Sequence, residues 1–287
     1  MVRNTAMKLL SNRYGKGRVR VMKILRDGAM HTIKEIDVAA LLTGDFAASY
    51  TGADNSKVVA TDTIRNTVNV LAKEHLGMEI ERFGLAVGQH FLKRYEQVES
   101  ASAEIFAKNW QRMEIGGKPH PHSFQAGSEA KMWTRVLCAR DAEPTIQSGV
   151  RDLVILKSTG SGWEGYPRDE YTTLPETNDR ILATSFDATW TWSGTPRDYN
   201  GANEAIIAAM LTVFANNYSP SAQASVYEMG TAALEACPEI SRIELKMPNK
   251  HCLLLNLAPF GLENKNEVFV PTDEPHGQIE GTVVRDE

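Results

Sequence analysis

Two histidines in one polar segment are candidates for chemistry, because imidazole binds transition metals and carries protons near neutral pH. His120 and His122 flank Pro121 in the segment KPHPHSF. An H-x-H pair can supply two zinc ligands, but no third ligand is evident nearby. The pattern therefore favours loop histidines without a metal over a zinc site. No ligand spacing is found around the histidines at His31, His75, His90 and His276.

A glycine-rich segment follows an apolar stretch and fits the pattern G-x-G-x-x-G over residues 160–165. A dinucleotide site needs a helix to begin there, because the helix N-terminus faces the pyrophosphate. Residues 166–174 contain a proline and no helical stripe of apolar side chains. The segment therefore predicts a flexible loop, and we expect no dinucleotide and no other cofactor.

Three tryptophans could stack on a planar ligand, and their surroundings separate them. Trp190 and Trp192 alternate with polar residues in the segment SFDATWTW, which predicts a strand that buries both indoles in the core. Trp163 stands in the glycine-rich loop, where a large aromatic side chain has no obvious core to fill. Trp163 is therefore the candidate for contact with a ligand.

Five further polar residues carry no spacing pattern that would identify a catalytic site. Lys16 is typical of a solvated lysine at the end of a strand. Thr61 and Asp62 precede a helical pattern and by themselves predict a helix N-cap. Asn249 and His251 interrupt a strand pattern, which is mildly unusual. Periodicity assigns catalysis to none of these five positions.

The elements that must position these residues follow from apolar periodicity. The first half predicts strands at 18–25 and 32–42, helices at 60–75 and 83–91, strands at 101–113 and 130–140, and a polar loop at 116–128. The second half predicts strands at 153–159 and 185–192, helices at 204–217 and 221–237, and strands at 241–247 and 251–257. The buried face predicted for the first helix is formed by Ile64, Val68, Leu71 and His75.

The same pattern of two strands, two helices and two strands therefore occurs twice, with a period of half the chain. This predicts duplication of one unit, with domains at residues 1–137 and 138–287. Helices segregated on one face of antiparallel sheets make the expected fold α+β. Open four-stranded sheets leave edges that need cover, which favours assembly into a closed oligomer.

Charge and cysteine content restrict the class of protein. The formal net charge of −5 and the pI of about 5.9 argue against nucleic-acid binding, which usually needs a basic surface. Cys138, Cys237 and Cys252 are far apart and odd in number, which favours free thiols, with an intersubunit disulfide as the alternative. No segment predicts a secretion signal, a membrane span or a peroxisomal address, so we expect a cytoplasmic protein.

Six segments together resemble the urate oxidase (uricase) family of the bacterial type. They are RYGKGRVRV, SYTGADNSKVVATDTIRNTV, GGKPHPHSF, LKSTGSGWEGYPRDEYTTLPETNDRILAT, SAQASVYEM and MPNKH, in this order and with suitable gaps. Each segment is a weak signal alone, but the joint pattern covers most of the chain and is highly specific.

The resemblance implies the tunnelling fold, with two ββααββ units in each subunit. It also implies a barrel-like homotetramer whose active sites lie at subunit interfaces. Urate and O2 would be the substrates, 5-hydroxyisourate and hydrogen peroxide the products, and no cofactor, nucleic acid or membrane would take part.

By the same resemblance, Lys16, Thr61 and His251 form a proton relay. Asn249 helps to hold oxygen or water above the substrate ring, and Asp62 orients the interface near the substrate. Lysine suits the role of a base, and the protein must also fix the ring and stabilise negative charge.

The resemblance assigns substrate binding to Thr61, Asp62 and Asn249 and to four further residues. Arg180 binds the anionic urate, Gln223 binds its opposite edge, and the backbone at Ala222 adds a hydrogen bond. One position departs from the family, which usually has phenylalanine where this chain has Trp163. Tryptophan keeps a π-face that can stack on the purine, but it is larger and changes the space left for the substrate.

Two alternatives come from other classes of protein. The first is another tunnelling-fold enzyme acting on a pterin or purine, such as a cyclohydrolase. Such enzymes generally use a metal or a different acid-base set, and no Cys/His ligand set is visible here. The second is a non-catalytic purine-binding oligomer, in which Lys16, Thr61 and His251 would be inert.

Overall fold

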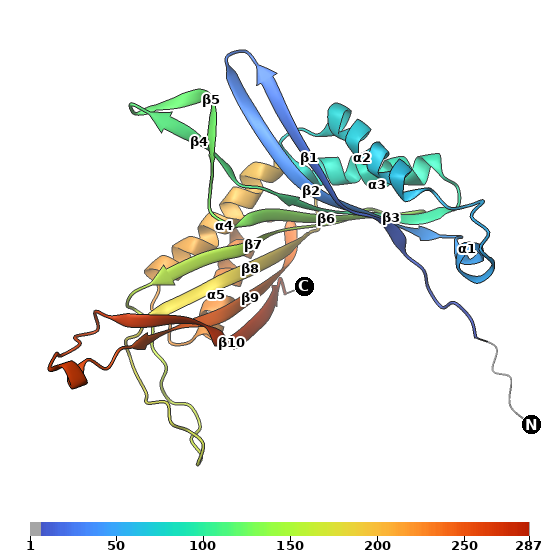
Figure 1. The fold of residues 1–287 in the computed structure, drawn as a ribbon. Coiled ribbons are helices and arrows are strands. Elements are labelled where there is room, and N and C mark those ends of the chain that lie inside the picture. Colours follow the sequence, from blue (N-terminus) through green and yellow to red (C-terminus); the bar gives the residue numbers. More distant parts are fainter. Residues whose placement is uncertain (1–6, 287) are drawn as a thin grey trace, which may run out of the picture. The chain divides into compact units, whose positions relative to one another are not determined.

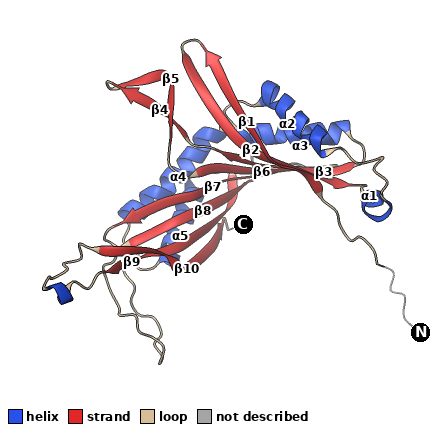
Figure 2. Cartoon of the chain, in the orientation of Figure 1, coloured by secondary structure: helices blue, strands red, loops and turns tan. Residues whose placement is uncertain are grey.

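The computed structural model describes residues 7–286, which form two compact units (Figure 1, Figure 2). The first unit comprises the chain up to Gly127 together with Met132–Ser148, and the second comprises Ser128–Lys131 and the chain from Gly149 onward. Both units combine strands with a few helices, which confirms the α+β class. Within residues 7–286, no helix is both long enough and apolar enough to span a membrane.

The first unit has four strands in the order β1-β2-β3-β6, and each pairs antiparallel with its neighbour. The strands are β1 (Tyr14–Asp27), β2 (Met30–Gly44), β3 (Val98–Ala107) and β6 (Lys131–Ala139). The helices between β2 and β3 are α1 (Ala47–Gly52), α2 (Thr61–His75) and α3 (Ile80–Arg94). The strands predicted at 18–25 and 32–42 and the two longer helices are confirmed.

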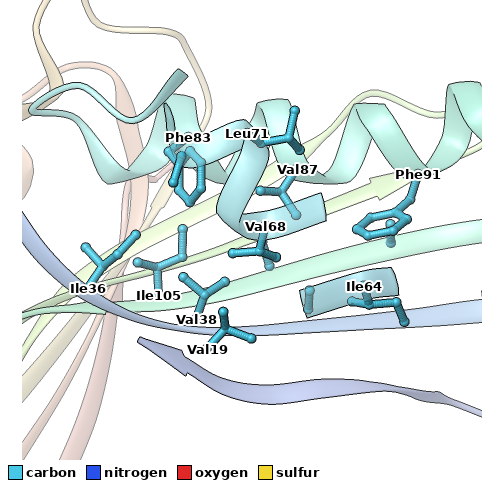
Figure 3. Packing of buried hydrophobic residues seen from close by; sticks show 14 of the residues in the cluster. Val19, Ile36, Val38, Ile64, Val68, Leu71, Phe83, Val87, Phe91 and Ile105 are labelled. Carbon is cyan, nitrogen blue, oxygen red and sulfur yellow. The ribbon is translucent and has the colours of Figure 1, made fainter. Parts of the chain in front are cut away.

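The core of the first unit lies between its sheet and helices α2 and α3 (Figure 3). Side chains alternate between the two faces of a strand, so Ile36 and Val38 of β2 both point into this core. Helix α3 adds Phe83, Val87 and Phe91, whose spacing of four residues keeps them on one helical face.

Helix α2 buries Ile64, Val68 and Leu71 as predicted. The prediction that His75 shares this buried face is wrong, because the histidine is exposed. The helix ends at His75, and the buried place beyond it is taken by Leu76, which is 0% exposed.

The predictions of a strand at 101–113 and a loop at 116–128 are both wrong in detail. Strand β3 ends at Ala107, and a separate antiparallel hairpin follows. Its strands are β4 (Trp110–Ile115) and β5 (Lys118–Ala126), so most of the expected loop is extended chain.

Two glycines and two prolines explain this difference. Gly116 and Gly117 form the hairpin turn with φ values of +60° and +73°, a conformation that glycine adopts without steric cost. Pro119 and Pro121 cannot donate backbone hydrogen bonds and are confined to the edges of sheets. They obscured the strand pattern, while the Gly-Gly pair was the available signal for a hairpin.

The second unit contains β7 from Gly149 onward, and its strands have the order β7-β8-β9-β10. Strand β9 pairs antiparallel with both β8 and β10. The strands are β7 (Thr145–Lys157), β8 (Leu182–Trp192), β9 (Ile240–Leu254) and β10 (Phe269–Val284). Helices α4 (Tyr199–Asn216) and α5 (Ala222–Ala236) connect β8 to β9, and a short 3-10 helix, η1 (Ala258–Phe260), precedes β10. The predicted strand at 185–192 and both helices are confirmed.

Strand β9 is continuous, whereas the sequence predicted separate strands at 241–247 and 251–257. Asn249 and His251 therefore lie within a strand and do not interrupt it. Strand β10 was not predicted, because Pro271 and Pro275 break its apolar alternation.

Two glycines allow α3 to approach β6 closely. A Cβ atom at Gly84 would lie 2.6 Å from Cγ2 of Val136, and one at Gly88 would lie 2.6 Å from Sγ of Cys138. Cys138 is a free, buried thiol, and burial raises its pKa to about 11. The helix therefore leaves no space for even one methyl group at these points.

We expect Gly84→Ala to lower the free energy of unfolding by about 1–3 kcal/mol, because an added methylene overpacks a filled core. Urea denaturation followed by circular dichroism measures this change. Gly77→Ala is the matched control, because a Cβ atom there meets nothing within 4 Å. A Gly84→Ala protein as stable as the parent would contradict the close approach of α3 to β6.

Candidate active site

The loop between β7 and β8, residues 158–181, is tied to the start of α5 by backbone hydrogen bonds, and we call it the site loop. Ser219 donates its N–H to the carbonyl of Gly160 (2.9 Å), and Gly162 donates its N–H to the carbonyl of Ser219 (2.8 Å). We call this pair of bonds the Ser219 bridge. It fixes the base of the predicted loop beside Ala222, the first residue of α5.

Further backbone hydrogen bonds place Trp163 and Arg180 in the same region. The N–H of Arg180 donates to the carbonyl of Ser161 (2.8 Å). Trp163 and Thr177 exchange two bonds, of 2.7 and 3.1 Å, across the site loop. As a result, the guanidinium carbon of Arg180 lies 5.8 Å from the centroid of the Trp163 ring.

Arg180 brings a cation into partly buried surroundings. Its Nε atom is buried and has no hydrogen-bond partner among the described residues. Burial lowers the pKa of its guanidinium and Tyr218 opposes this shift, but arginine stays charged at neutral pH. A buried charged donor without a partner costs free energy, so Arg180 is placed to receive an anionic ligand.

Two buried hydroxyls of the second unit also lack hydrogen-bond partners within residues 7–286. They belong to Ser161, whose carbonyl accepts from Arg180, and to Thr184 near the start of β8. Both residues are at most 1% exposed. Buried polar atoms are nearly always paired, so these hydroxyls indicate places where a water or a polar ligand belongs.

The N-terminus of α5 adds further donors. The hydroxyl of Ser221 caps the helix by accepting the N–H of Ala224 (3.1 Å). Ala222 and Gln223 precede Ala224 in the first turn of the helix, where backbone N–H groups have no acceptor within the helix. The helix dipole favours negative charge at this end, and the side chain of Gln223 is exposed.

Strand β9 presents Asn249 and His251 on one face, because residues two apart in a strand point the same way. This is the face of Met247, which is buried in the core of the second unit. Asn249 pairs in register with Thr184 of β8, so the unpaired Thr184 hydroxyl lies on the same face as Asn249. Both predicted residues are half-buried.

A register shift in β10 lies opposite these residues. His251 pairs with Thr272 and Asn249 pairs with Gly277, so the chain from 273 to 276 bulges opposite the single residue Lys250. The ammonium of Lys250 binds the carboxylate of Asp273 in this bulge (2.8 Å).

In the first unit, a hydrogen bond links the segments that carry Lys16 and Thr61. The hydroxyl of Tyr14 accepts a hydrogen bond from the N–H of Val59 (2.8 Å). Tyr14 is two positions before Lys16, and Val59 is two positions before Thr61. Burial raises the pKa of Tyr14. Lys16 is half-buried and immediately precedes a register shift between β1 and β2, where Arg18 has a φ of +56°.

The prediction that Thr61 or Asp62 is an N-cap is wrong. The N-cap of α2 is Ala60, which has no capping side chain, and Thr61 is the first helical residue. Asp62 instead forms an ion pair with Arg65 (2.8 Å) and accepts a hydrogen bond from Asn66 (3.2 Å). The hydroxyl of Thr61 is therefore not used for capping.

In the folded chain, His31 lies near the histidines of the β4–β5 hairpin, which the sequence spacing did not indicate. The ring of His122 lies 4.7 Å from that of His120 and 6.0 Å from that of His31, measured between centroids. In the part of the chain that the structure describes, no group of three or more His, Cys, Asp or Glu side chains is placed to hold a metal ion.

The predicted site residues divide between the two units. The first unit contains Lys16, Thr61 and Asp62. The second unit contains Trp163, Arg180, Ala222, Gln223, Asn249 and His251. Sequence reasoning missed Ser219 and Thr184, because their positions in the site depend on backbone pairing between segments that are distant in the sequence.

Comparison with known proteins gives one consistent result. The uricase family model matches residues 12–136 and 146–280. The uricase of Arthrobacter globiformis is 40% identical over 285 residues, which cover 98% of this chain and 91% of that protein. The uricase of Arabidopsis thaliana is 41% identical over 297 aligned positions, which cover 96% of each protein.

Solved structures agree with these matches. The crystal structure of the Arthrobacter globiformis uricase has a TM-score of 0.93 at 39% identity, covering 98% of this chain and 96% of that one. A hyperthermostable mutant of Bacillus sp. TB-90 urate oxidase has a TM-score of 0.85 at 24% identity, which shows a shared fold alone. The family match over most of the chain, with relatives about 40% identical along nearly its full length, shows that this chain belongs to the uricase family.

Proposed function

We propose that this protein oxidises urate with molecular oxygen to 5-hydroxyisourate and hydrogen peroxide. The observation that carries the proposal is the buried, unpaired Nε of Arg180, which lies beside the Trp163 indole in a loop fixed to the N-terminus of α5. A cation, a flat aromatic face and a helix N-terminus together suit a planar anion. Membership of the uricase family supports urate as that anion.

In the proposed complex, Arg180 binds one edge of urate through its planar fork of N–H donors. Gln223 binds the opposite edge with a paired donor and acceptor, and the amide of Ala222 adds a hydrogen bond. Trp163 stacks on the ring. Asn249 holds oxygen or water above the ring, next to His251 on the same face of β9.

The proposed chemistry begins with removal of a proton from the urate monoanion. Lys16 accepts this proton with Thr61 as a carrier, while His251 tunes Lys16 and Asp62 orients the segment around Thr61. The resulting dianion is electron-rich and gives two electrons to O2, which takes up two protons, one returned from Lys16 and one from solvent, and leaves as hydrogen peroxide. A water molecule supplies the oxygen of the new hydroxyl group, so atoms and electrons balance.

We further propose that the reaction needs no cofactor. Residues 160–165 fit a dinucleotide pattern, but no helix begins in the site loop, which contains them. The pattern therefore lacks the helix N-terminus that would face a pyrophosphate. Urate itself is the electron donor in this scheme, so the protein has only to bind, deprotonate and orient it.

The finer architecture belongs to the same proposal. The two predicted domains, 1–137 and 138–287, would be tandem tunnelling-fold units, and four chains would form a barrel-like tetramer in the cytoplasm. Lys16, Thr61 and Asp62 of one subunit would meet the second-unit residues of another subunit. The division of the site residues between the two halves of the chain supports this sharing.

We expect Arg180→Ala to weaken binding of xanthine, a purine without the C8 oxygen, by roughly 2–4 kcal/mol, because a charged partner in a desolvated site is lost. Isothermal titration calorimetry measures the affinity. Arg242→Ala is the control, because Arg242 is part of the same unit and forms a surface ion pair with Glu244. Equal affinities of the Arg180→Ala protein and the parent would refute the assigned role.

We expect protein stripped of metals by exhaustive chelation to keep its full activity. The physical reason is that the proposed electron transfer runs directly from urate to O2. Loss of urate absorbance and uptake of O2 are measured before and after chelation. Complete loss of activity that a single metal restores would overturn the cofactor-free scheme.

We expect two inactive variants to complement one another if subunits share sites. Lys16→Ala and Arg180→Ala proteins are mixed, denatured together and refolded, and about a quarter of the random subunit pairings then contain both intact residues. Activity is compared with that of each variant refolded alone. Mixed oligomers without recovered activity would show that each subunit supplies its own complete site.

A further inference from the structure

Tyr166 lies against Trp163 within the site loop. The two ring centroids are 5.5 Å apart and the ring planes differ by 15°, which is a stacked arrangement. Aromatic pairs at such separations attract one another beyond the area they bury. The tyrosine therefore covers one face of the indole.

The loop backbone brings the two rings together over a spacing of three residues. Gly165 has a φ of +73°, in the left-handed region that favours glycine. Its N–H donates to the carboxylate of Glu176 on the returning side of the loop (2.9 Å). The chain thus reverses at Gly165 and returns Tyr166 to Trp163.

Tyr166 is itself held at its far end. Its hydroxyl donates a hydrogen bond to the carbonyl of Leu174, in the segment that returns towards Arg180. Phenylalanine at this position would stack but could not make that bond. Arg168 lies near the same ring, 5.9 Å from its centroid, which adds a weak contact.

Trp163 needs such support because its backbone alone does not orient its side chain. The two bonds to Thr177 fix the peptide groups of Trp163, but rotation about χ1 and χ2 could still turn the indole away. Trp163 is only half-buried, so the core does not lock it. The Tyr166 ring, which stacks on Trp163 and is hydrogen-bonded to Leu174, restrains this rotation of the indole.

We propose that Tyr166 is a positioning residue that holds the Trp163 indole in the orientation that stacks on the substrate. This inference rests on the proposed function. Because Tyr166 covers one indole face, a purine can stack only on the other face. The stack therefore sets the plane in which the substrate meets Arg180.

The test compares Tyr166→Ala and Tyr166→Phe in steady-state urate oxidation. Loss of one aromatic stack is expected to raise KM about two- to tenfold in Tyr166→Ala, with kcat changed less than about twofold, because ground-state and transition-state binding weaken alike. Tyr166→Phe keeps the ring and should fall between the alanine variant and the parent. Tyr171→Ala is the matched control, because this tyrosine of the same loop is 82% exposed and should leave KM unchanged.

A second measurement separates positioning of Trp163 from general support of the loop. In a Trp163→Ala background, adding Tyr166→Ala should change KM no further, because the two residues act as one unit. The quenching of tryptophan fluorescence by xanthine should weaken in Tyr166→Ala while the thermal midpoint stays near that of Tyr166→Phe. If Tyr166 only supported the loop, Tyr166→Ala would lower the thermal midpoint and would raise KM by the same factor in the parent and in the Trp163→Ala protein.

The outcomes distinguish this inference from the function on which it rests. A parent protein that does not consume urate overturns the proposed function and the positioning role with it. An active parent whose KM is unchanged by Tyr166→Ala overturns the positioning role alone. The positioning role alone would also be overturned if Tyr166→Ala raised KM by the same factor in the parent and in the Trp163→Ala protein.

Discussion

The Ser219 bridge is the contact on which the arrangement of the second-unit site depends. It joins the base of the site loop to the residues before α5, so Trp163, Arg180 and the first amides of the helix share one rigid frame. Gly162 makes the approach possible, because a Cβ atom there would lie 2.1 Å from the hydroxyl oxygen of Tyr218. The hydroxyl of Ser219 also pairs with that of Ser225 inside α5, which extends the connection into the helix.

Two groups of the protein itself create positive potential in this frame. The guanidinium of Arg180 and the N-terminus of α5 both favour an anion, and the capping hydroxyl of Ser221 leaves the first amides of the helix available. Asp179 is next to Arg180 in the sequence, but its carboxylate accepts hydrogen bonds from the hydroxyl of Thr159 (2.7 Å) and from the N–H of Gly160 (3.1 Å). The acid therefore braces the loop instead of neutralising the arginine.

Periodicity predicted the long helices, because each has one apolar face, and the strands at 18–25 and 32–42, where apolar side chains recur. It failed at β5 and β10, where prolines hide the alternation, and at His75, where a helix ends before its pattern does. The identity of the candidate site residues came from family resemblance, since Lys16 or Thr61 has no distinctive spacing. Tyr166 and Thr184 could not be predicted, because ring stacking and strand register are set only by the folded chain.

Arg180, Ser161 and Thr184 each bury a polar atom that pairs with no other group in residues 7–286, so part of the hydrogen-bonding capacity of the second unit is not used within that range. Each buried donor of this kind costs about 1–3 kcal/mol. A ligand that accepts a hydrogen bond from Arg180 would offset the part of this cost that arises at the guanidinium. By thermodynamic linkage, binding of such a ligand to the folded chain raises the free energy of unfolding as the ligand concentration rises.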